Sequence, residues 1–404
     1  MDLELSKRLK KSSKSKIVFL VIDGLGGTQK DKNGKTELEE AYTPNMDSLA
    51  SEGTCGMHIP VKPGITPGSG PGHLGIFGYD PLKYQVGRGV LSALGINFNL
   101  KENDIAARGN FCTLDKQGKV TDRRAGRIPT KKNKELCEIL NQIKLKEKDI
   151  EIFVKPVKEY RLLLALRGKK LSPDVEDTDP QEIGKKPLDP EPTSKEGGET
   201  AEIVSKFLTK VENRLKNQKT ANMLLLRGFS KKPDWPEIND VYGLKTAAIA
   251  AYPMYKGVSR LIGMDVLETG QTYEDEFDTL EKNWNKYDFF YIHMKKSDSA
   301  GEDGDFRRKV KEIEKVDKLI PRLLNLKPDV LVITGDHSTP SALKYHSWHS
   351  VPFLLWSKRC RRDRVESFGE TECIEKGGLD RCLPAKNLMP LAMAHADRLE
   401  KFGA

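Results

Sequence analysis

Six acidic and imidazole side chains stand at or just beyond the ends of short apolar runs in the sequence. They are Asp23, Asp298, Glu302, Asp336, His337 and His346. A pair of divalent cations needs oxygen and nitrogen ligands of this kind, drawn from several strand ends. Asp298 and Glu302 are four residues apart, one turn of a helix, so both carboxylates can face one ion. Each residue alone is typical of a cap or a turn, and only their joint position predicts a two-metal site.

A possible nucleophile, Ser69, lies in a turn rich in glycine and proline at residues 63–74, which leads into an expected short helix through Phe77. Amide groups at the N-terminus of that helix would hold a phosphoryl group or an oxyanion. A serine hydroxyl is a weak nucleophile near neutral pH and needs a base or a metal to activate it. No hydrolase elbow of Gly-x-Ser-x-Gly form surrounds Ser69, so activation by metal is preferred. The alternative is a serine that only caps the helix.

The apolar runs that precede these residues predict buried strands. They are residues 17–22, 288–292 and 330–334. Continuous apolar runs of five or six residues, separated by helical stretches such as residues 306–325, indicate a parallel sheet. Ligands bind beyond the carboxyl ends of the strands in such sheets. The sheet is therefore expected to bring the acidic and imidazole side chains together.

The composition fits a globular chain of two or three domains. It has 404 residues, of which 31% are charged and 37% hydrophobic. The longest aliphatic or aromatic run near the start has six residues, whereas a membrane span needs about 20. Residues 1–16 lack the apolar core of a secretory signal, and the six cysteines match no zinc or disulfide pattern. We therefore expect no membrane association, reduced cysteines and a cytoplasmic location.

The charge balance favours an anionic partner. The chain has 68 basic and 59 acidic residues, a formal net charge of +9. Because the excess is spread along the chain, a small anionic molecule is expected rather than nucleic acid. The one local cluster of lysine and arginine, within residues 1–16, is expected to be a solvated and partly disordered N-terminal extension, with a docking arm as the alternative.

The order of these features along the chain predicts an inserted domain. The residues suited to catalysis occur before about residue 80 and after about residue 290. Between them, residues 172–198 contain five prolines and few large apolar side chains, which predicts a long exposed loop or a lid. We expect a parent domain formed by residues 17–82 and 219–404, and an inserted domain at residues 83–218.

Long motifs follow one another from the start of the chain to its end. Besides Asp23-Gly24 they are residues 43–50 (TPNMDSLA), 67–74 (PGSGPGHL), 107–111 (ARGNF), 122–127 (DRRAGR), 226–228 (LRG), 256–265 (KGVSRLIGMD), 296–305 (KSDSAGEDGD) and 334–340 (TGDHSTP). Together they resemble the archaeal-type 2,3-bisphosphoglycerate-independent phosphoglycerate mutases of the alkaline phosphatase superfamily, over about residues 17–395. The resemblance implies an alkaline-phosphatase-like α/β sandwich with a mainly parallel central sheet, and a smaller inserted α+β lid domain.

The resemblance also implies a two-metal site at which Ser69 accepts a phosphoryl group. One ion would be surrounded by Asp23, Ser69, Asp336 and His337, and the other by Asp298, Glu302 and His346. The reaction would move phosphate between the 3- and 2-hydroxyls of glycerate through a phosphoserine, without 2,3-bisphosphoglycerate as a cofactor. A closing inserted domain would clamp the small phosphorylated substrate and exclude water.

The resemblance leaves the roles of several further residues open. Candidates for the substrate clamp in the inserted domain are Arg123, Arg124 and Arg127, because guanidinium groups match carboxylate and phosphate. Surface pairing is the alternative for each arginine. His73 is a candidate proton shuttle or phosphate contact. His293 and His349 could be spare ligands, but structural or outer roles are preferred.

The sequence departs from the usual family pattern at two positions. Gly70 stands where an acidic residue is common, and Glu302 stands where a histidine is usual. Glutamate is a harder ligand, so Mn²⁺ or Mg²⁺ is expected, with Zn²⁺ as the alternative. A phosphatase or phosphotransferase acting on another small phosphorylated metabolite is a rival function, and an inactive binding or regulatory homologue is a second.

Overall fold

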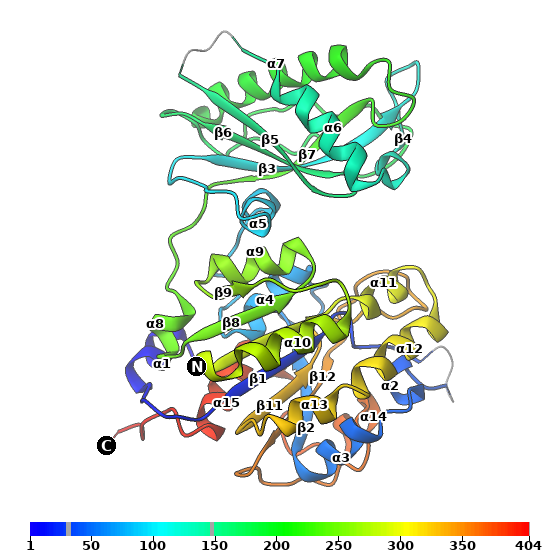
Figure 1. Cartoon of the computed structure of the whole chain (residues 1–404). Coiled ribbons are helices and arrows are strands. Elements are labelled where there is room, and N and C mark those ends of the chain that lie inside the picture. The colour runs from blue at the N-terminus through cyan, green and yellow to red at the C-terminus, as the bar shows by residue number, and fades with distance from the viewer. Residues whose placement is uncertain (30–33, 146–148, 404) are drawn as a thin grey trace. The chain divides into compact units, whose positions relative to one another are not determined.

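The computed structural model describes residues 1–29, 34–145 and 149–403 and divides into two compact units (Figure 1). Unit 1 comprises Met1–Gln85 and Trp235–Ala404, and unit 2 is Val86–Asp234. The first border lies close to the expected residue 83. The second lies beyond the expected residue 218 because β7 (Met223–Ser230) pairs with β3 of unit 2.

Unit 1 is built on an eight-stranded sheet with the order β13-β2-β12-β11-β1-β10-β8-β9. The strands are β1 (Ile17–Ile22), β2 (Thr54–Ile59), β8 (Thr246–Ala250), β9 (Asp265–Leu267), β10 (Phe289–Met294), β11 (Val330–Thr334), β12 (Val351–Ser357) and β13 (Leu383–Pro384). β1 pairs in parallel with both β10 and β11, while β12 runs antiparallel to β11 and β2. The expected mainly parallel central sheet is confirmed.

Helices pack on both faces of this sheet (Figure 1). They are α1 (Leu3–Leu9), α2 (Glu37–Glu40), α3 (Pro44–Glu52), α4 (Ser69–Ile76), α8 (Ile238–Tyr242), α9 (Pro253–Leu261), α10 (Tyr273–Asn283), α11 (Lys296–Glu302), α12 (Phe306–Asp317), α13 (Ile320–Asn325), α14 (Glu370–Glu375) and α15 (Leu388–His395), with short 3-10 helices η3 (Trp284–Lys286) and η4 (Ala385–Asn387). Val18, Leu20 and Ile22 of β1 share a core with α3, α10, α12 and α13, because alternate strand side chains point to one face. On the other face, the rings of Phe77 and Tyr291 pack together, with their centroids 5.0 Å apart. None of the described helices has the length and apolar character needed to cross a membrane.

Two expectations about unit 1 differ from the structure. The helix expected over residues 306–325 is two helices, α12 and α13. Pro321 lies in the first turn of α13, where its missing N–H is tolerated, whereas it would break the interior of a longer helix. The N-terminal residues form α1 instead of a disordered extension. Asp2 caps this helix by accepting from Leu5 N at 2.8 Å, and Leu3 is buried.

Unit 2 is an antiparallel sheet with helices on its two faces, so the α+β character expected for the insert is present. Its other elements are β3 (Ile105–Leu114), β4 (Val120–Asp122), β5 (Glu151–Lys158), β6 (Arg161–Arg167), α5 (Arg88–Gly95), α6 (Thr130–Asn141), α7 (Gly198–Leu215), η1 (Ala125–Arg127) and η2 (Lys195–Gly197). β3 pairs with β4, β6 and β7, and β6 with β5. α6 and α7 bury their apolar faces against this sheet, while α5 lies on the other side of it (Figure 1). A Cβ on Gly89 would stand 2.0 Å from Ala106 O, so glycine is what lets α5 approach β3 so closely.

The proline-rich segment at residues 172–198 is ordered in its middle. Val175 forms a β-bridge with Pro192. Thr178 is fully buried; its N–H donates to Leu226 O at 2.9 Å and its hydroxyl oxygen accepts from Leu226 N at 2.8 Å. The centre of the expected exposed loop is therefore fixed to β7, although its prolines prevent regular secondary structure.

An aromatic clasp holds together the two places where unit 2 interrupts unit 1. The ring centroids of Tyr79 and Tyr84 lie 5.2 Å apart, and those of Tyr84 and Trp235 lie 5.4 Å apart. The Tyr79 hydroxyl donates to Pro236 O at 2.6 Å. These residues all belong to unit 1, so its two chain segments are joined by its own side chains.

Candidate metal centre and anion site

Three parallel strands of unit 1 bring acidic side chains to one edge of the sheet. Asp23 follows β1, Asp336 and His337 follow β11, and Asp298 lies on α11, which begins just after β10. All four side chains are buried. Because β1 lies between β10 and β11, the ends of these strands are adjacent, in the way that the sequence predicts.

The first cluster gathers around the imidazole of His337. Its Nε2 lies 3.4 Å from Asp23 Oδ1, 3.2 Å from Asp336 Oδ2 and 3.3 Å from Ser69 Oγ. Asp23 Oδ1 and Asp336 Oδ2 are buried and have no hydrogen-bond partner among the described residues. Orphaned carboxylate oxygens beside an imidazole nitrogen fit a divalent cation.

The second cluster contains Asp298, His337 and His346, whose ligand atoms lie within 4.8 Å of one another. His346 Nε2 is 3.5 Å from Asp298 Oδ1 and 4.0 Å from Glu302 Oε1. Glu302 is one helical turn from Asp298, but half of its side chain is exposed, so it stands at the rim of the cluster. The structure differs from the expected grouping because His337 is close to both clusters.

Hydrogen bonds select the ring nitrogen that each histidine can offer to a metal. His346 Nδ1 lies 3.0 Å from Pro67 O, and a carbonyl only accepts, so Nδ1 carries the hydrogen. Thr339 Oγ1 lies 2.8 Å from Asp298 Oδ1 and 2.9 Å from His337 Nδ1. The hydroxyl has one hydrogen, and giving it to the carboxylate requires His337 Nδ1 to donate in turn. Both histidines then keep a lone pair on Nε2, as metal ligation requires.

Ser69 is the first residue of α4, the short helix that the sequence predicts. A Cβ on Gly72 would stand 2.3 Å from Asp336 O, so glycine allows the first turn of α4 to approach the end of β11. The half-buried Ser69 side chain is thereby held beside His337 while the amides of the turn remain near it. This arrangement suits a nucleophile whose product is an anion.

Donors around Asp23 hold it as a carboxylate. Its Oδ2 accepts from the Tyr255 hydroxyl and lies 3.1 Å from His293 Nε2 and 3.2 Å from Lys295 Nζ. Burial would raise the pKa of Asp23, but Lys295 and the neighbouring histidines more than offset it and hold the pKa well below its usual range. Burial lowers the pKa of Lys295, but the carboxylates of Asp23 and Asp298 have the larger effect and raise it above its usual value. Lys295 therefore stays protonated. The sequence motifs gave no signal for Tyr255, which comes from α9.

His73 contacts the main chain of the nucleophile and a carboxylate. Its Nδ1 lies 2.8 Å from Ser69 O and 3.1 Å from Asp336 Oδ2. Burial lowers the pKa of His73, but Asp336 more than offsets this and raises it. These contacts hold His73 beside Ser69 and Asp336, and its expected role as a proton shuttle or phosphate contact stays a prediction. His349 bonds to Ser347 Oγ at 2.9 Å and belongs to neither cluster.

Unit 2 contains a cluster of arginines that the sequence analysis did not predict. Arg108 on β3 stands directly opposite Arg227 on β7, with Arg88 and Arg161 close enough to act on its charge. The Nε of Arg108 is buried without a partner among the described residues. Burial and the three neighbouring arginines lower the pKa of Arg108 to about 9. Like charges facing each other across strands are unfavourable, so this cluster is suited to bind an anion.

The three arginines expected to clamp substrate have different environments. Arg123 forms a bidentate pair with the buried Asp179, at 3.0 Å from Nε to Oδ1 and 2.7 Å from NH2 to Oδ2. Arg124 and Arg127 are exposed and flank a turn in which Ala125, Gly126 and Arg127 all have positive φ. Arg123 is thus engaged within the fold, while Arg124 and Arg127 are exposed.

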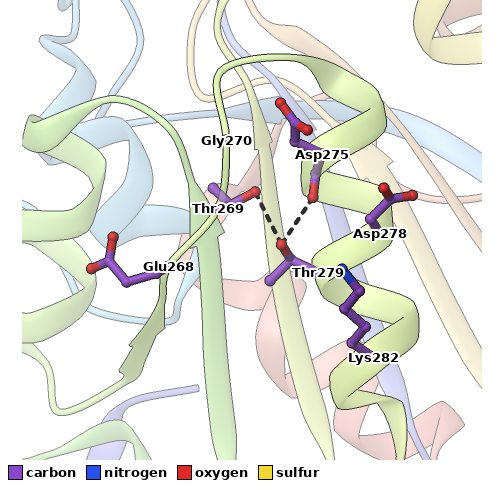
Figure 2. A pocket seen from close by; sticks show the side chains of 7 residues that line it. All are labelled: Glu268, Thr269, Gly270, Asp275, Asp278, Thr279 and Lys282. Atoms are coloured by element: carbon purple, nitrogen blue, oxygen red, sulfur yellow. Dashed lines mark hydrogen bonds between the residues drawn. The ribbon is translucent and has the colours of Figure 1, made fainter.

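A cavity of about 320 Å³ beside the start of α10 shares no residue with either cluster (Figure 2). It is lined by Glu268, Thr269, Gly270, Asp275, Asp278, Thr279 and Lys282. The Thr279 hydroxyl donates to Asp275 O at 2.9 Å and lies 3.1 Å from Thr269 Oγ1. Asp275 Oδ2 accepts from Thr272 N at 3.0 Å and completes the cap of α10. The polar groups here serve the helix end, so the cavity is not part of the candidate site.

A family model described as 2,3-bisphosphoglycerate-independent phosphoglycerate mutase matches residues 50–221. The chain is 52% identical over 390 residues to a probable 2,3-bisphosphoglycerate-independent phosphoglycerate mutase from Thermosipho africanus, covering 96% of each chain. It is 51% identical over 411 residues to a protein of the same description from Aquifex aeolicus, covering 100% of each. A solved structure from Pyrococcus horikoshii has a TM-score of 0.82 and 30% identity, covering 98% of this chain and 100% of that one. The cofactor-independent phosphoglycerate mutase from Thermoplasma acidophilum has a TM-score of 0.69 and 29% identity, covering 95% and 100%.

Proposed function

The chain belongs to the 2,3-bisphosphoglycerate-independent phosphoglycerate mutase family, and from that premise we propose that it interconverts 3-phosphoglycerate and 2-phosphoglycerate through a phosphoserine on Ser69. The observation that carries this proposal is the position of Ser69. Its hydroxyl lies 3.3 Å from His337 Nε2, at the start of a helix and beside two carboxylate oxygens that have no hydrogen-bond partner among the described residues.

Two divalent cations are the cofactors that this donor set fits. One would be held by Asp23, Ser69, Asp336 and His337, and the other by Asp298, His346 and Glu302, with His337 close to both. Bound there, the ions would lower the pKa of the Ser69 hydroxyl and neutralise charge on the phosphoryl group. Carboxylate oxygens outnumber imidazole nitrogens, which favours Mn²⁺ or Mg²⁺ over Zn²⁺.

The chain's own residues account for the rest of the reaction. Ser69 Oγ attacks phosphorus, the bond from phosphorus to the substrate oxygen breaks, and the departing oxygen takes up a proton equivalent to the one that Ser69 loses. The glycerate then turns, and its other hydroxyl attacks phosphorus in a second displacement, in which the bond from phosphorus to Ser69 Oγ breaks and Ser69 takes up a proton equivalent to the one that this hydroxyl loses. The first-turn amides of α4 stabilise the phosphoryl charge. Water must be excluded between the two displacements, because its attack on phosphoserine would release phosphate.

The arginine cluster of unit 2 supplies the charge that the substrate needs. Phosphoglycerate carries a phosphate and a carboxylate, and guanidinium groups bind both through paired hydrogen bonds. We assign this contact to Arg108, with Arg88, Arg161 and Arg227 around it. Arg124 and Arg127 stay candidates for a second contact, whereas Arg123 orders the turn that carries them.

The rival function is metal-dependent phosphate transfer or hydrolysis on another small phosphorylated metabolite. The observation that favours it is Gly70, which is buried directly after the nucleophile where the family commonly has an acidic residue. An inactive homologue is the non-enzyme rival. A cytoplasmic location and a small-molecule partner rather than nucleic acid stay predictions from the sequence.

A coupled assay tests the proposal and its rivals together. Chelator-stripped protein is given 3-phosphoglycerate, enolase and Mn²⁺, Mg²⁺ or Zn²⁺, with 2,3-bisphosphoglycerate omitted. We expect turnover that depends on metal. Release of phosphate without formation of 2-phosphoglycerate would favour the phosphatase. Folded protein that shows no activity with any of the metals would indicate a different phosphorylated substrate or the inactive homologue.

The nucleophile is tested by Ser69→Ala, which should lower mutase activity by at least about a thousandfold because no phosphoserine can form. Binding of Mn²⁺ at Asp298 and His346 should persist, measured by calorimetric titration. Thr66→Ala, in the same loop and exposed, is the matched control and should keep full activity. Wild-type turnover by Ser69→Ala would exclude the phosphoserine mechanism.

A further inference from the structure

A fully buried lysine lies behind the candidate metal centre. Lys309 on α12 is 0% exposed, and its ammonium donates to Gly26 O and to Thr339 O, each at 3.0 Å. Burial lowers the pKa of Lys309, and Glu37, whose Oε2 is 3.5 Å away, opposes that shift. A buried ammonium is costly unless it is paired and hydrogen-bonded, so its place calls for a role.

The two carbonyls that Lys309 binds belong to the loops that carry the metal ligands. Gly26 is three residues after Asp23, and Thr339 is two residues after His337. Thr339 N also donates to Gly26 O at 3.0 Å. The lysine therefore fastens the loop that follows β1 to the loop that follows β11.

Two buried glutamates, Glu37 and Glu370, accept hydrogen bonds from the segments that continue these loops. Glu37 on α2 accepts from Ser341 N at 2.7 Å. Glu370 on α14 accepts from Gly27 N at 2.8 Å and from the Thr36 hydroxyl at 2.6 Å. Lysine and glutamates thus form one network that reaches both loops without touching Ser69 or the orphaned carboxylate oxygens.

Thr339 packs closely against two glycines and hydrogen-bonds a residue of each metal cluster. A Cβ on Gly24 would stand 2.6 Å from Thr339 Oγ1, and one on Gly301 would stand 2.2 Å from Thr339 O. Its hydroxyl bonds both Asp298 and His337. A shift of the Thr339 main chain would therefore disturb its hydrogen bonds to Asp298 and His337.

We propose that Lys309 and Thr339 are positioning residues for the metal centre. Lys309 fixes the main chain of Thr339, and the Thr339 hydroxyl orients Asp298 and keeps the hydrogen of His337 on Nδ1. This inference rests on the proposed function, since it requires that the two clusters bind metal. It goes beyond that function by naming two residues outside the metal ligands that would set the affinity for metal.

The threonine is tested by a pair of variants that separates its hydroxyl from its packing. Thr339→Val removes the hydroxyl at similar volume, and Thr339→Ser keeps it. Calorimetric titration of Mn²⁺ into chelator-stripped protein should show affinity about 10- to 100-fold weaker for the valine variant, with the serine variant close to wild type. The absorption of bound Co²⁺ should also change in the valine variant, because His337 loses the partner that fixes its hydrogen. Equal Mn²⁺ affinity in all three proteins would overturn the role of Thr339.

The lysine is tested by Lys309→Met against Lys16→Met. Lys16 also donates to two carbonyls, Trp284 O at 2.8 Å and Tyr287 O at 2.7 Å, but at the opposite end of β1. Measured below the melting temperature of each variant, Lys309→Met should weaken Mn²⁺ binding about 10- to 100-fold and Lys16→Met should leave it unchanged. Wild-type Mn²⁺ affinity in folded Lys309→Met, or an equal loss in both variants, would overturn the role of Lys309.

The same titrations separate this inference from the proposed function. Wild-type protein that binds no Mn²⁺, Mg²⁺ or Zn²⁺ would refute the metal centre and the inference together. Wild-type binding with unaffected variants would refute only the positioning role. If Lys309→Met does not fold, Thr339→Val and Thr339→Ser still decide whether this network acts on the metal centre.

Discussion

The acidic centre of unit 1 and the arginine cluster of unit 2 both concentrate like charges, but they are built differently. In unit 1 the carboxylates of Asp23, Asp298 and Asp336 are buried at strand ends, with donors such as Lys295 and Thr339 fixing individual oxygens. In unit 2, Arg108 faces Arg227 across two strands and keeps a buried Nε without a described partner. A metal needs its ligands at fixed distances, whereas an anion needs a surplus of donors.

The titration behaviour of the two regions follows this difference. Opposite charges hold the pKa of Asp23 well below its usual range in spite of burial. Burial and like charges lower the pKa of Arg108 to about 9. The acidic centre is therefore partly compensated by its own neighbours. In the arginine cluster, Arg227 is paired with Asp177 and Asp179, but the buried Nε of Arg108 has no hydrogen-bond partner among the described residues.

The sharpest way to break this comparison is Arg108→Met. Removing the central guanidinium should lower kcat/KM by at least about a hundredfold, since a charge-assisted contact to the substrate is lost. It should also stabilise the ligand-free protein by about 1 kcal/mol, because a buried and unpaired charge disappears. Steady-state kinetics and thermal unfolding measure the two effects.

Arg123→Met is the control for that experiment. It would leave the buried Asp179 carboxylate without its bidentate partner, so a loss of stability of about 3 kcal/mol is expected, with a smaller effect on kcat/KM. If Arg123→Met instead lost activity without losing stability, and Arg108→Met kept its activity, the clamp would belong to Arg123 as the sequence suggested.

A buried carboxylate outside both regions gives a reference for an uncompensated charge. Glu276 on α10 is 2% exposed, and burial raises its pKa to about 8, although Ala251 N donates to it at 3.0 Å. Below the unfolded pKa of about 4.5 the group is neutral in both states. As the pH rises towards 8 the unfolded chain loses this proton and the folded protein keeps it, so stability falls.

Glu276→Gln should remove that pH dependence without affecting activity. The difference in free energy of unfolding between the Glu276→Gln variant and the wild type should increase, in favour of the variant, by on the order of 3 kcal/mol from pH 5 to pH 9. Denaturant unfolding at several pH values measures the difference. A constant difference across this range would show that Glu276 ionises normally in the folded protein.

The smallest effect is expected at the rim of the acidic centre. Glu302→His should shift the ratio of Zn²⁺ to Mn²⁺ affinity by about tenfold towards Zn²⁺, because imidazole is a softer ligand than carboxylate. Asp303→His, one position along and exposed, is the matched control. An unchanged metal profile in Glu302→His would mean that Glu302 is not a ligand.

The sequence predicts the acidic centre better than the arginine cluster for a physical reason. Asp23, Asp336 and His337 directly follow apolar runs, and parallel strands bring such positions together whatever the connections between them. Arg108 and Arg227 meet only through the antiparallel register of β3 and β7, which no local pattern reveals. One sequence feature could have indicated the cluster: Arg108 and Arg227 each lie within an apolar segment, where a charge needs a partner or a ligand.

The misjudged elements have local causes of the same kind. An uninterrupted helical pattern concealed the break at Pro321, which shows only when the turn that accepts a proline is located. Lysine and arginine in residues 1–16 suggested a solvated tail, but Leu3 finds a buried place. Lys309 was hidden because a lysine on an amphipathic helix is ordinarily solvent-facing.

The aromatic clasp of Tyr79, Tyr84 and Trp235 makes unit 2 an exchangeable cassette. Since these rings join the two chain segments of unit 1 on either side of the insert, we expect unit 1 to keep its fold when residues 86–234 are replaced by a short peptide. Evolution can then lengthen or exchange the insert while the chemistry at the strand ends of unit 1 is inherited intact. Substrate specificity and phosphoryl chemistry could then evolve independently within one gene.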